Sequence, residues 1–241
     1  MSPQDPEYVR WQRLTAISYS QLAGVYLMQG KLEESLLANQ KDLAISERSA
    51  AGDPTSAENR YDVAAARVRI GDVRIEQGMF PEALAEFEHA ATAVRRLVRD
   101  DPDNADWKNS LTVALDRIGK VHLRQQQYDA ALTVLSESLE IKRGLVEQDD
   151  HPHARRSMML SHNRIGDVHA ERGDHRAALA EYEKANQFIV EVAEATPENL
   201  GYQRDLSTSW SLMANEHEFF GRHRQARSLR QQALAISERL A

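Results

Sequence analysis

The sequence contains no cysteine, few glycines and prolines, and few aromatic residues. Without cysteine, the chain has no disulfide bond, no thiolate zinc site and no cysteine nucleophile. Only 11 glycines, 7 prolines and 6% aromatic residues occur among 241 residues, whereas helix-forming residues are abundant. This composition predicts an all-helical protein.

Long apolar runs and an excess of positive charge are also missing. No apolar stretch approaches the ~20 residues that span a bilayer, and the N-terminal segment has no apolar run of signal-peptide length. We therefore expect a cytoplasmic protein that does not act at a membrane. The formal net charge of −7 would repel a phosphate backbone, so nucleic acid is not an expected partner.

The feature that the sequence does contain is an internal repeat. Its clearest copies are RIGDVRIEQGMFPEAL from Arg69, RIGKVHLRQQQYDAAL from Arg117 and RIGDVHAERGDHRAAL from Arg164. A small residue marks one column of every copy, at Ala23, Gly71, Gly119, Gly166 and Ala214, with spacings of 48, 48, 47 and 48 residues. The pattern predicts one domain, residues 1–241, with repeats at approximately 5–52, 53–100, 101–148, 149–195 and 196–241.

Each repeat is predicted to be a pair of antiparallel helices. A glycine seven residues after the small residue is expected to end the first helix in the left-handed conformation, at Gly30, Gly78, Gly173 and Gly221. Gln126 takes this place in the third copy. In four copies an alanine follows five residues later, and we expect it to face the small residue so that the two helix backbones approach closely.

The starts of the first helices also have sequence signals. A capping residue followed by proline at the first helical position is predicted at Asp5-Pro6, Asp53-Pro54, Asp101-Pro102 and Thr196-Pro197. The fourth copy lacks this pair, so its first helix is expected to begin about one turn later, near Pro152. Three copies carry an aromatic residue twelve positions before the small residue, at Trp11, Trp107 and Tyr202, and these should fill the seam between adjacent hairpins.

These columns resemble the tetratricopeptide repeat family. The residues that match the family's pattern in order are Ile70, Gly71, Gly78, Phe80, Ala83, Phe87 and Ala90. The family's usual unit has 34 residues, so we expect each helix here to be longer by about two turns. The resemblance covers nearly the whole chain and implies an all-α fold, a right-handed α-solenoid of five antiparallel helix pairs.

What the resemblance implies about function is the binding of a protein or peptide in a concave groove lined by the first helices. The expected groove residues are Arg69, Asp72, Asp116, Arg117, Lys120, Asn163, Arg164, Asp167 and Asn215. One interpretation is that the arginines accept carboxylates from a partner segment. The other is that Arg69 with Asp72, and Arg164 with Asp167, pair along one helix face.

No pattern points to catalysis or to a cofactor. The sequence has no phosphate-binding glycine loop, no nucleophile elbow and no HExxH motif. Three histidines share a column, at His122, His169 and His217, but equivalent positions in stacked hairpins lie roughly 10 Å or more apart, too far for one zinc ion. We therefore expect a protein that is not an enzyme and that has neither a metal site nor a cofactor.

Three interpretations of the function remain open. The chain is a scaffold or adaptor, the regulatory arm of a larger signalling protein such as a kinase, a protease or a nucleotide-hydrolysing switch, or a self-associating module. The last helix carries Glu238 and the arginines Arg222, Arg224, Arg227, Arg230 and Arg239, a solvated face or a contact for an acidic partner. Because no polar capping helix follows, we expect either a fragment or a homo-oligomer formed through terminal helices.

Overall fold

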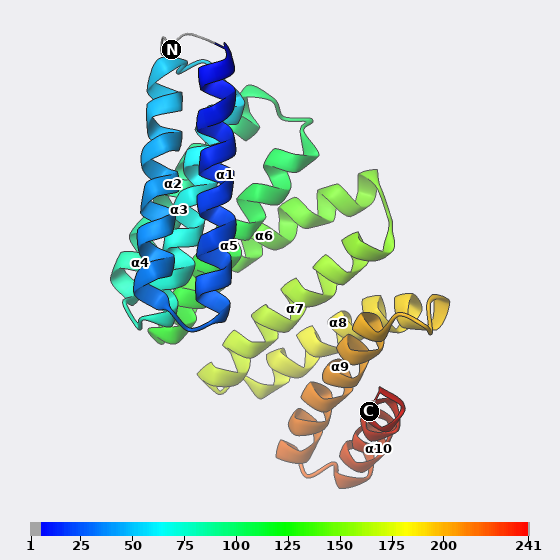
Figure 1. Cartoon of the computed structure of the whole chain (residues 1–241). Coiled ribbons are helices and arrows are strands. Elements are labelled where there is room, and N and C mark those ends of the chain that lie inside the picture. The colour runs from blue at the N-terminus through cyan, green and yellow to red at the C-terminus, as the bar shows by residue number, and fades with distance from the viewer. Residues whose placement is uncertain (1–5, 241) are drawn as a thin grey trace. The chain divides into compact units, whose positions relative to one another are not determined.

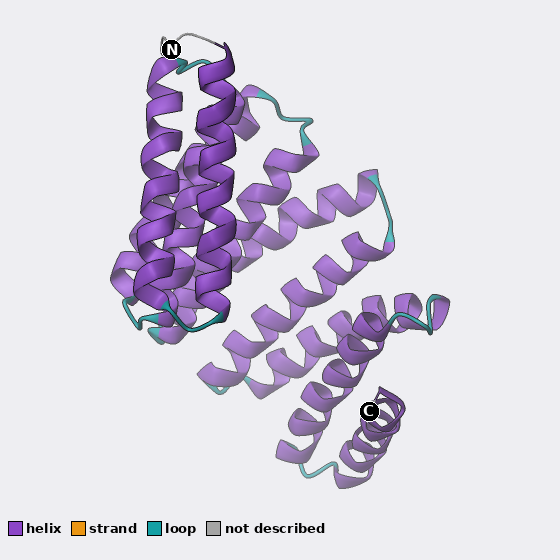
Figure 2. Ribbon diagram, viewed as in Figure 1, coloured by secondary structure: helices purple, strands orange, loops and turns teal. Residues whose placement is uncertain are grey.

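The computed structural model of the chain describes residues 6–240, which form ten helices and no strand (Figures 1 and 2). The first five are α1 (Pro6–Met28), α2 (Leu32–Gly52), α3 (Ala57–Glu76), α4 (Phe80–Asp100) and α5 (Ala105–Arg124). The others are α6 (Tyr128–Gln148), α7 (Pro152–Arg172), α8 (His175–Ala195), α9 (Leu200–Phe219) and α10 (His223–Leu240). The predicted all-α fold class is confirmed. None of these helices is both long enough and apolar enough to cross a bilayer.

The chain divides into two compact units, Met1–Gln125 and Gln126–Ala241. In the first unit α1 packs on α2, α3 on α4, and α2 and α4 each contact the helix that follows. In the second unit α7 packs on α8 and α9 on α10, while α6 contacts α7 and α8 contacts α9. Within each unit, consecutive helices therefore pack as a tetratricopeptide repeat predicts, and a single domain over residues 1–241 stays a prediction.

The turn inside each helix pair has the predicted left-handed residue. The φ angles are 71° at Gly30, 76° at Gly78, 91° at Gly173 and 70° at Gly221, and Gln126 alone has a positive φ, 59°, among the described residues other than glycine. At Gly78 the following residue, Met79, donates its amide to the Arg74 carbonyl at 2.8 Å, which satisfies a carbonyl at the helix end. Gln126 thus adopts the glycine conformation at an energetic cost.

The predicted starts of α3, α5 and α9 are wrong. These helices begin three residues after the proline, and their amides are capped by the side chains of Ser56, Asn104 and Asn199. Asp53 instead ends α2 and opens a turn in which the Ser56 amide approaches the Asp53 carbonyl at 3.4 Å. The proline at the second place of this turn has a fixed φ that suits it, and it has no amide hydrogen with which to continue α2.

The helices α1 and α7 both begin at a proline. α1 begins at Pro6, and Asp5 lies outside the described residues. α7 begins at Pro152, as expected, and His151 caps it by accepting the Ala154 amide at 3.2 Å. This start is fourteen residues before the small residue, the same column at which α3, α5 and α9 begin. The fourth copy is therefore not delayed relative to the second, third and fifth copies.

At Gly71 and Gly166, the small residue of the first helix makes room for an aromatic ring of the second helix. A Cβ added at Gly71 would lie 2.5 Å from Cε1 of Phe87, and a Cβ at Gly166 would lie 2.5 Å from Cε1 of Tyr182. Each ring lies one turn beyond the alanine that recurs in the second helix, Ala83 or Ala178, and Phe87 is fully buried. The closest packing at these glycines is thus a backbone against an aromatic face.

The aromatic column has different surroundings in different repeats. Tyr202 is buried in a cluster with Met159 and Ile189, as predicted. Trp107 packs against Tyr61, with ring centroids 5.1 Å apart. Trp11 is 59% exposed, which contradicts its predicted role in a seam, because no second helix precedes α1 among the described residues.

Candidate functional site

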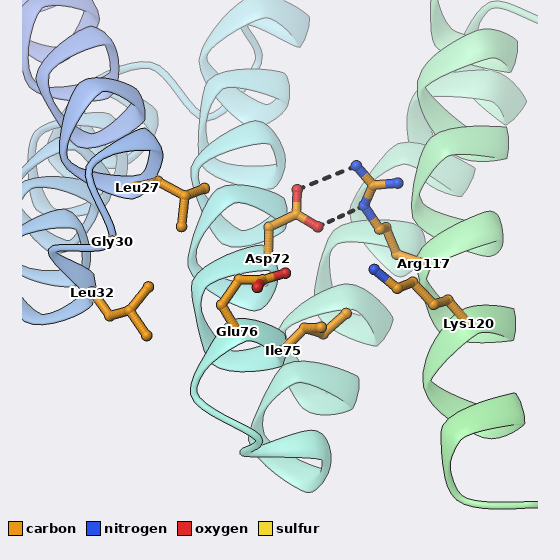
Figure 3. Close-up of a pocket in the computed structure, with 8 residues that line it drawn as sticks. All are labelled: Leu27, Gly30, Leu32, Asp72, Ile75, Glu76, Arg117 and Lys120. Carbon is orange, nitrogen blue, oxygen red and sulfur yellow. Dashed lines mark hydrogen bonds and ion pairs between the residues drawn. The ribbon is translucent and has the colours of Figure 1, made fainter. Parts of the chain in front are cut away.

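A groove of about 520 Å³ lies in the first unit, beside the turn between α1 and α2 and along α3 and α5 (Figure 3). Its lining residues are Leu27, Gly30, Leu32, Asp72, Ile75, Glu76, Arg117 and Lys120. Leu27 and Leu32 extend toward α3 from one side, and Arg117 and Lys120 extend from α5 on the other. Most lining residues come from the first helices, and three of them, Asp72, Arg117 and Lys120, belong to the predicted set.

An ion pair joins the two long walls of this groove. Arg117 donates from Nε to Asp72 Oδ1 at 2.6 Å and from Nη2 to Asp72 Oδ2 at 3.4 Å. The two side chains are only about one third exposed. The forked guanidinium of Arg117 is therefore already matched with a carboxylate of the protein, and the pair holds α5 to α3.

Two other charged groups in the groove are unmatched. Lys120 and Glu76 are exposed, and neither forms a hydrogen bond or an ion pair within residues 6–240. The partly buried side chains of Leu27, Leu32 and Ile75 lie beside them. The groove thus offers an ammonium group, a carboxylate and an apolar floor, a combination that suits an extended peptide with both apolar and polar side chains.

Arg69 makes a different ion pair from the one considered on sequence grounds. Its Nη2 lies 2.5 Å from Oδ2 of Asp42 in α2, whose side chain is 3% exposed. Asp72, three residues after Arg69, is paired with Arg117 instead. In the first repeat the column of Asp72 holds Gly24, which has no carboxylate to offer Arg69. The pairing of Arg69 with Asp72 along one helix face is therefore wrong.

In the second unit, Asp167 is engaged by the protein itself. It accepts a hydrogen bond from the Tyr182 hydroxyl at 2.8 Å. Burial raises the pKa of Asp167, and the Tyr182 hydroxyl and the positive charge of Arg164 offset only part of that rise. Burial together with the Asp167 charge also raises the pKa of Tyr182. This carboxylate is consequently occupied in supporting α7 against α8.

The remaining predicted residues also contact the protein interior or a neighbouring helix. Asp116 is buried, so it offers little surface to a ligand. Asn163 donates to the Met159 sulfur at 3.1 Å, and Asn215 accepts from Arg230 at 3.3 Å. None of these three lines the groove of the first unit.

Sequence reasoning missed the groove residues one turn further along the first helices. Glu76 follows Asp72 by four positions, so both lie on one face of α3. Leu27 and Ile75 share the column four residues after the small residue, and both are apolar. Extending the predicted face by one turn would have identified these three side chains.

The described residues contain no cluster that could hold a metal ion. Between Pro6 and Leu240, no three histidine or carboxylate side chains converge in such a group. In the histidine column, His169 Nδ1 lies 3.7 Å from Oδ2 of Asp174, which belongs to the adjacent turn.

Comparison with known proteins identifies the repeat. The model of a family described as "Tetratricopeptide repeat" matches residues 15–55 and 111–153. No curated protein sequence matches this chain. Repeats of a kinesin light chain from Podosopora anserina are 16% identical with a TM-score of 0.62, and the alignment covers 92% of this chain and 95% of that one.

Two further crystal structures have the same arrangement of helices. RapI in its apo form is 12% identical with a TM-score of 0.55, and the alignment covers 95% of this chain and 85% of that one. BtubC from P. vanneervenii is 14% identical with a TM-score of 0.52, and the shares are 87% and 92%. These likenesses confirm the predicted fold.

Proposed function

We propose that the chain, of which residues 15–55 and 111–153 match a tetratricopeptide repeat model, is a protein-binding scaffold that holds an extended segment of a partner in the groove of the first unit. The observation that carries the proposal is the pair of unmatched charges, Lys120 and Glu76, beside an apolar floor. Unsatisfied charges at the rim of an apolar groove give a ligand both orientation and specificity.

The lining residues define the partner segment by its chemistry. The ammonium group of Lys120 would donate hydrogen bonds to a carboxylate of an acidic side chain or of a chain terminus. Glu76 would accept hydrogen bonds from a basic side chain or from free backbone amides. Leu27, Leu32 and Ile75 would bury an apolar side chain between these two contacts. We propose for the chain a binding role in the cytoplasm and no catalysed reaction.

Arg117 has a supporting role in this proposal. Since its guanidinium is paired with Asp72, it fixes the distance between the walls of the groove and leaves recognition to Lys120. Arg69, Asp167 and Asn215 likewise form an ion pair or a hydrogen bond with another residue of the chain. The ligand contacts that we propose are therefore fewer than the nine predicted residues.

Selection of peptides from a displayed random library on the purified chain tests this function. We expect selected peptides to contain an acidic residue near an apolar one and to bind at least tenfold more weakly to the Lys120→Glu variant. Arg99→Glu is the matched control, because Arg99 is exposed on α4 and lies outside the groove. Peptides that bind Lys120→Glu and wild type equally would contradict the proposed site.

A further inference from the structure

One face of α1 carries an exposed apolar stripe, which we define as Trp11, Leu14, Ser18, Leu22 and Val25. The four apolar side chains are 59%, 44%, 41% and 43% exposed in that order, and Ser18 between them is exposed too. Successive members are three, four, four and three residues apart. On a helix with 3.6 residues per turn, this spacing places all five on one side.

Three of these five columns, those of Ser18, Leu22 and Val25, are buried in the second and third repeats. Leu22 aligns with Ile70, Ile118 and Ile165, which are 4%, 4% and 6% exposed. Val25 aligns with Val73, Val121 and Val168, and Ser18 aligns with Ala66 and Ala114, all of which are fully buried.

In α3 these residues pack against the preceding second helix. Ile70 and Val73 form a cluster with Leu36 of α2. The part of the stripe from Ser18 to Val25 therefore corresponds to the face with which α3 packs against a second helix, and on α1 no helix within residues 6–240 covers it. Burial of such side chains contributes roughly 25 cal/mol per Å² of apolar surface, so covering the stripe is favourable.

We propose that the α1 stripe is the interface of a homodimer in which two α1 helices pack antiparallel across a two-fold axis at Ser18. The spacing of the stripe is symmetric about this residue. In such a pair Trp11 lies opposite Val25 of the partner subunit, and Leu14 lies opposite Leu22 of the partner subunit. A two-fold interface requires a self-complementary surface of this kind, and the small serine at the axis lets the helices approach closely.

The other helix of a second copy that could cover the stripe is α10, in a head-to-tail arrangement. Of its exposed side chains, Arg227 and Arg230 occupy the columns at which α2 has the buried Leu36 and Asn39. Arg230 is also paired with Glu218. Packing Leu22 and Val25 against these side chains would remove the Arg227 guanidinium from water without a matching acceptor, which is unfavourable. The antiparallel α1 pair avoids this cost.

The length of the stripe sets the expected strength of association. From Trp11 to Val25 it extends about 21 Å along the helix axis. A single helix pair of this length buries less surface than a standard stable interface, so we expect a dissociation constant on the order of micromolar.

Analytical ultracentrifugation of the purified chain over a range of roughly 1 to 200 μM tests the interface. We expect a monomer–dimer equilibrium for wild type and a monomer throughout for Val25→Glu, whose charge would be buried at the interface. Leu37→Glu is the matched control, because Leu37 is also an exposed apolar residue, on α2, and it should leave the dimer intact. A monomeric wild type, larger assemblies, or loss of association in Leu234→Glu on α10 would overturn the proposal.

A cross-linking experiment tests the register independently. Since the chain has no cysteine, Ser18→Cys introduces a single thiol, which the two-fold axis places beside its counterpart in the partner subunit. We expect mild oxidation to produce a disulfide-linked dimer. Two Met28→Cys thiols would lie about 30 Å apart in the same dimer and should not link. Linking through Met28→Cys in place of Ser18→Cys would overturn the antiparallel register. The outcome does not depend on peptide binding.

Discussion

The Arg117 guanidinium crosses from α5 to α3 and binds the Asp72 carboxylate, with Nε 2.6 Å from Oδ1. Arg117 stands two positions before the small residue of its repeat, and Asp72 stands one position after the small residue of the preceding repeat. Because both side chains are about one third exposed, solvent screens the pair, and its contribution to stability is modest. Its main consequence is geometric, since it fixes one wall of the groove against the other.

Breaking this pair should cost little stability. We expect Arg117→Ala to lower the free energy of unfolding by roughly 0.2–1 kcal/mol. Each single charge reversal, Asp72→Arg or Arg117→Asp, should lower the free energy of unfolding, and the double variant with both exchanges should be more stable than either single reversal. Urea unfolding of wild type, the two single reversals and the double variant measures the coupling energy. A coupling energy of zero would mean that the two side chains do not interact in solution.

Gly71 should not tolerate a methyl group. A Cβ at this position would lie 2.5 Å from the Phe87 ring, so Gly71→Ala should destabilise the protein by roughly 1–3 kcal/mol despite the better helix propensity of alanine. Gly24→Ala on α1 is the matched control, because nothing lies within 4 Å of its added Cβ. That variant should be more stable by up to about 1 kcal/mol. Thermal unfolding that gave both variants the same sign would contradict the packing of Phe87 on Gly71.

Gln126 holds a left-handed conformation that costs a side-chain-bearing residue energy. Its φ of 59° matches the glycine values in the other turns, so Gln126→Gly should stabilise the protein by several tenths of a kcal/mol to about 1. Gln125→Gly, one residue earlier at a φ of −91°, should instead destabilise it. Melting temperatures of the two variants test this difference, and a lower value for Gln126→Gly would refute the turn assignment.

Glu181 gives stability a specific dependence on pH. Burial alone would raise the pKa of Glu181, but its hydrogen bonds with His162, at 2.7 Å, and Lys184, at 2.6 Å, lower it to about 2 from the ordinary 4.5. A carboxyl group with a lowered folded-state pKa stabilises the protein above its unfolded-state pKa and loses that effect as the pH falls toward the folded-state value. We therefore expect Glu181→Gln to be less stable than wild type at pH 7.

The difference between Glu181→Gln and wild type should then shrink as the pH falls from 4.5 to 2. Urea unfolding of both proteins at several pH values measures it. A difference that stays constant across this window would show that the Glu181 carboxylate does not carry the stabilisation.

Features that depend on one residue and its own backbone could be predicted from the sequence. The turns at Gly78 and Gln126 are examples, because a recurring glycine marks the left-handed position in the sequence and Gln126 occupies the same column. The helix starts were harder, since proline suits both the first turn of a helix and the second place of a β-turn. Ser56 and Asn104 are themselves good caps, and they lie three residues beyond the predicted ones.

Features that depend on how two helices are set against each other could not be read from one helix. Arg69 reaches Asp42, and Arg117 reaches Asp72, although both arginines occupy the same column of the repeat. The first repeat has Gly24 in the column of Asp72, so Arg69 has no carboxylate there to pair with. Whether an arginine reaches a neighbouring helix at all depends on the distance between the two helices. Trp11 likewise matches Tyr202 in sequence and differs in exposure, because burial depends on a neighbouring helix.

The central claim is that a partner segment lies in the groove of the first unit. Hydrogen–deuterium exchange of the chain, with and without a selected peptide, tests it most directly. We expect slower exchange at the turn that includes Gly30, at the C-terminal half of α3 and at α5 around Lys120, with α4 unchanged. Protection confined to α2 and α4, or to the second unit, would contradict the claim.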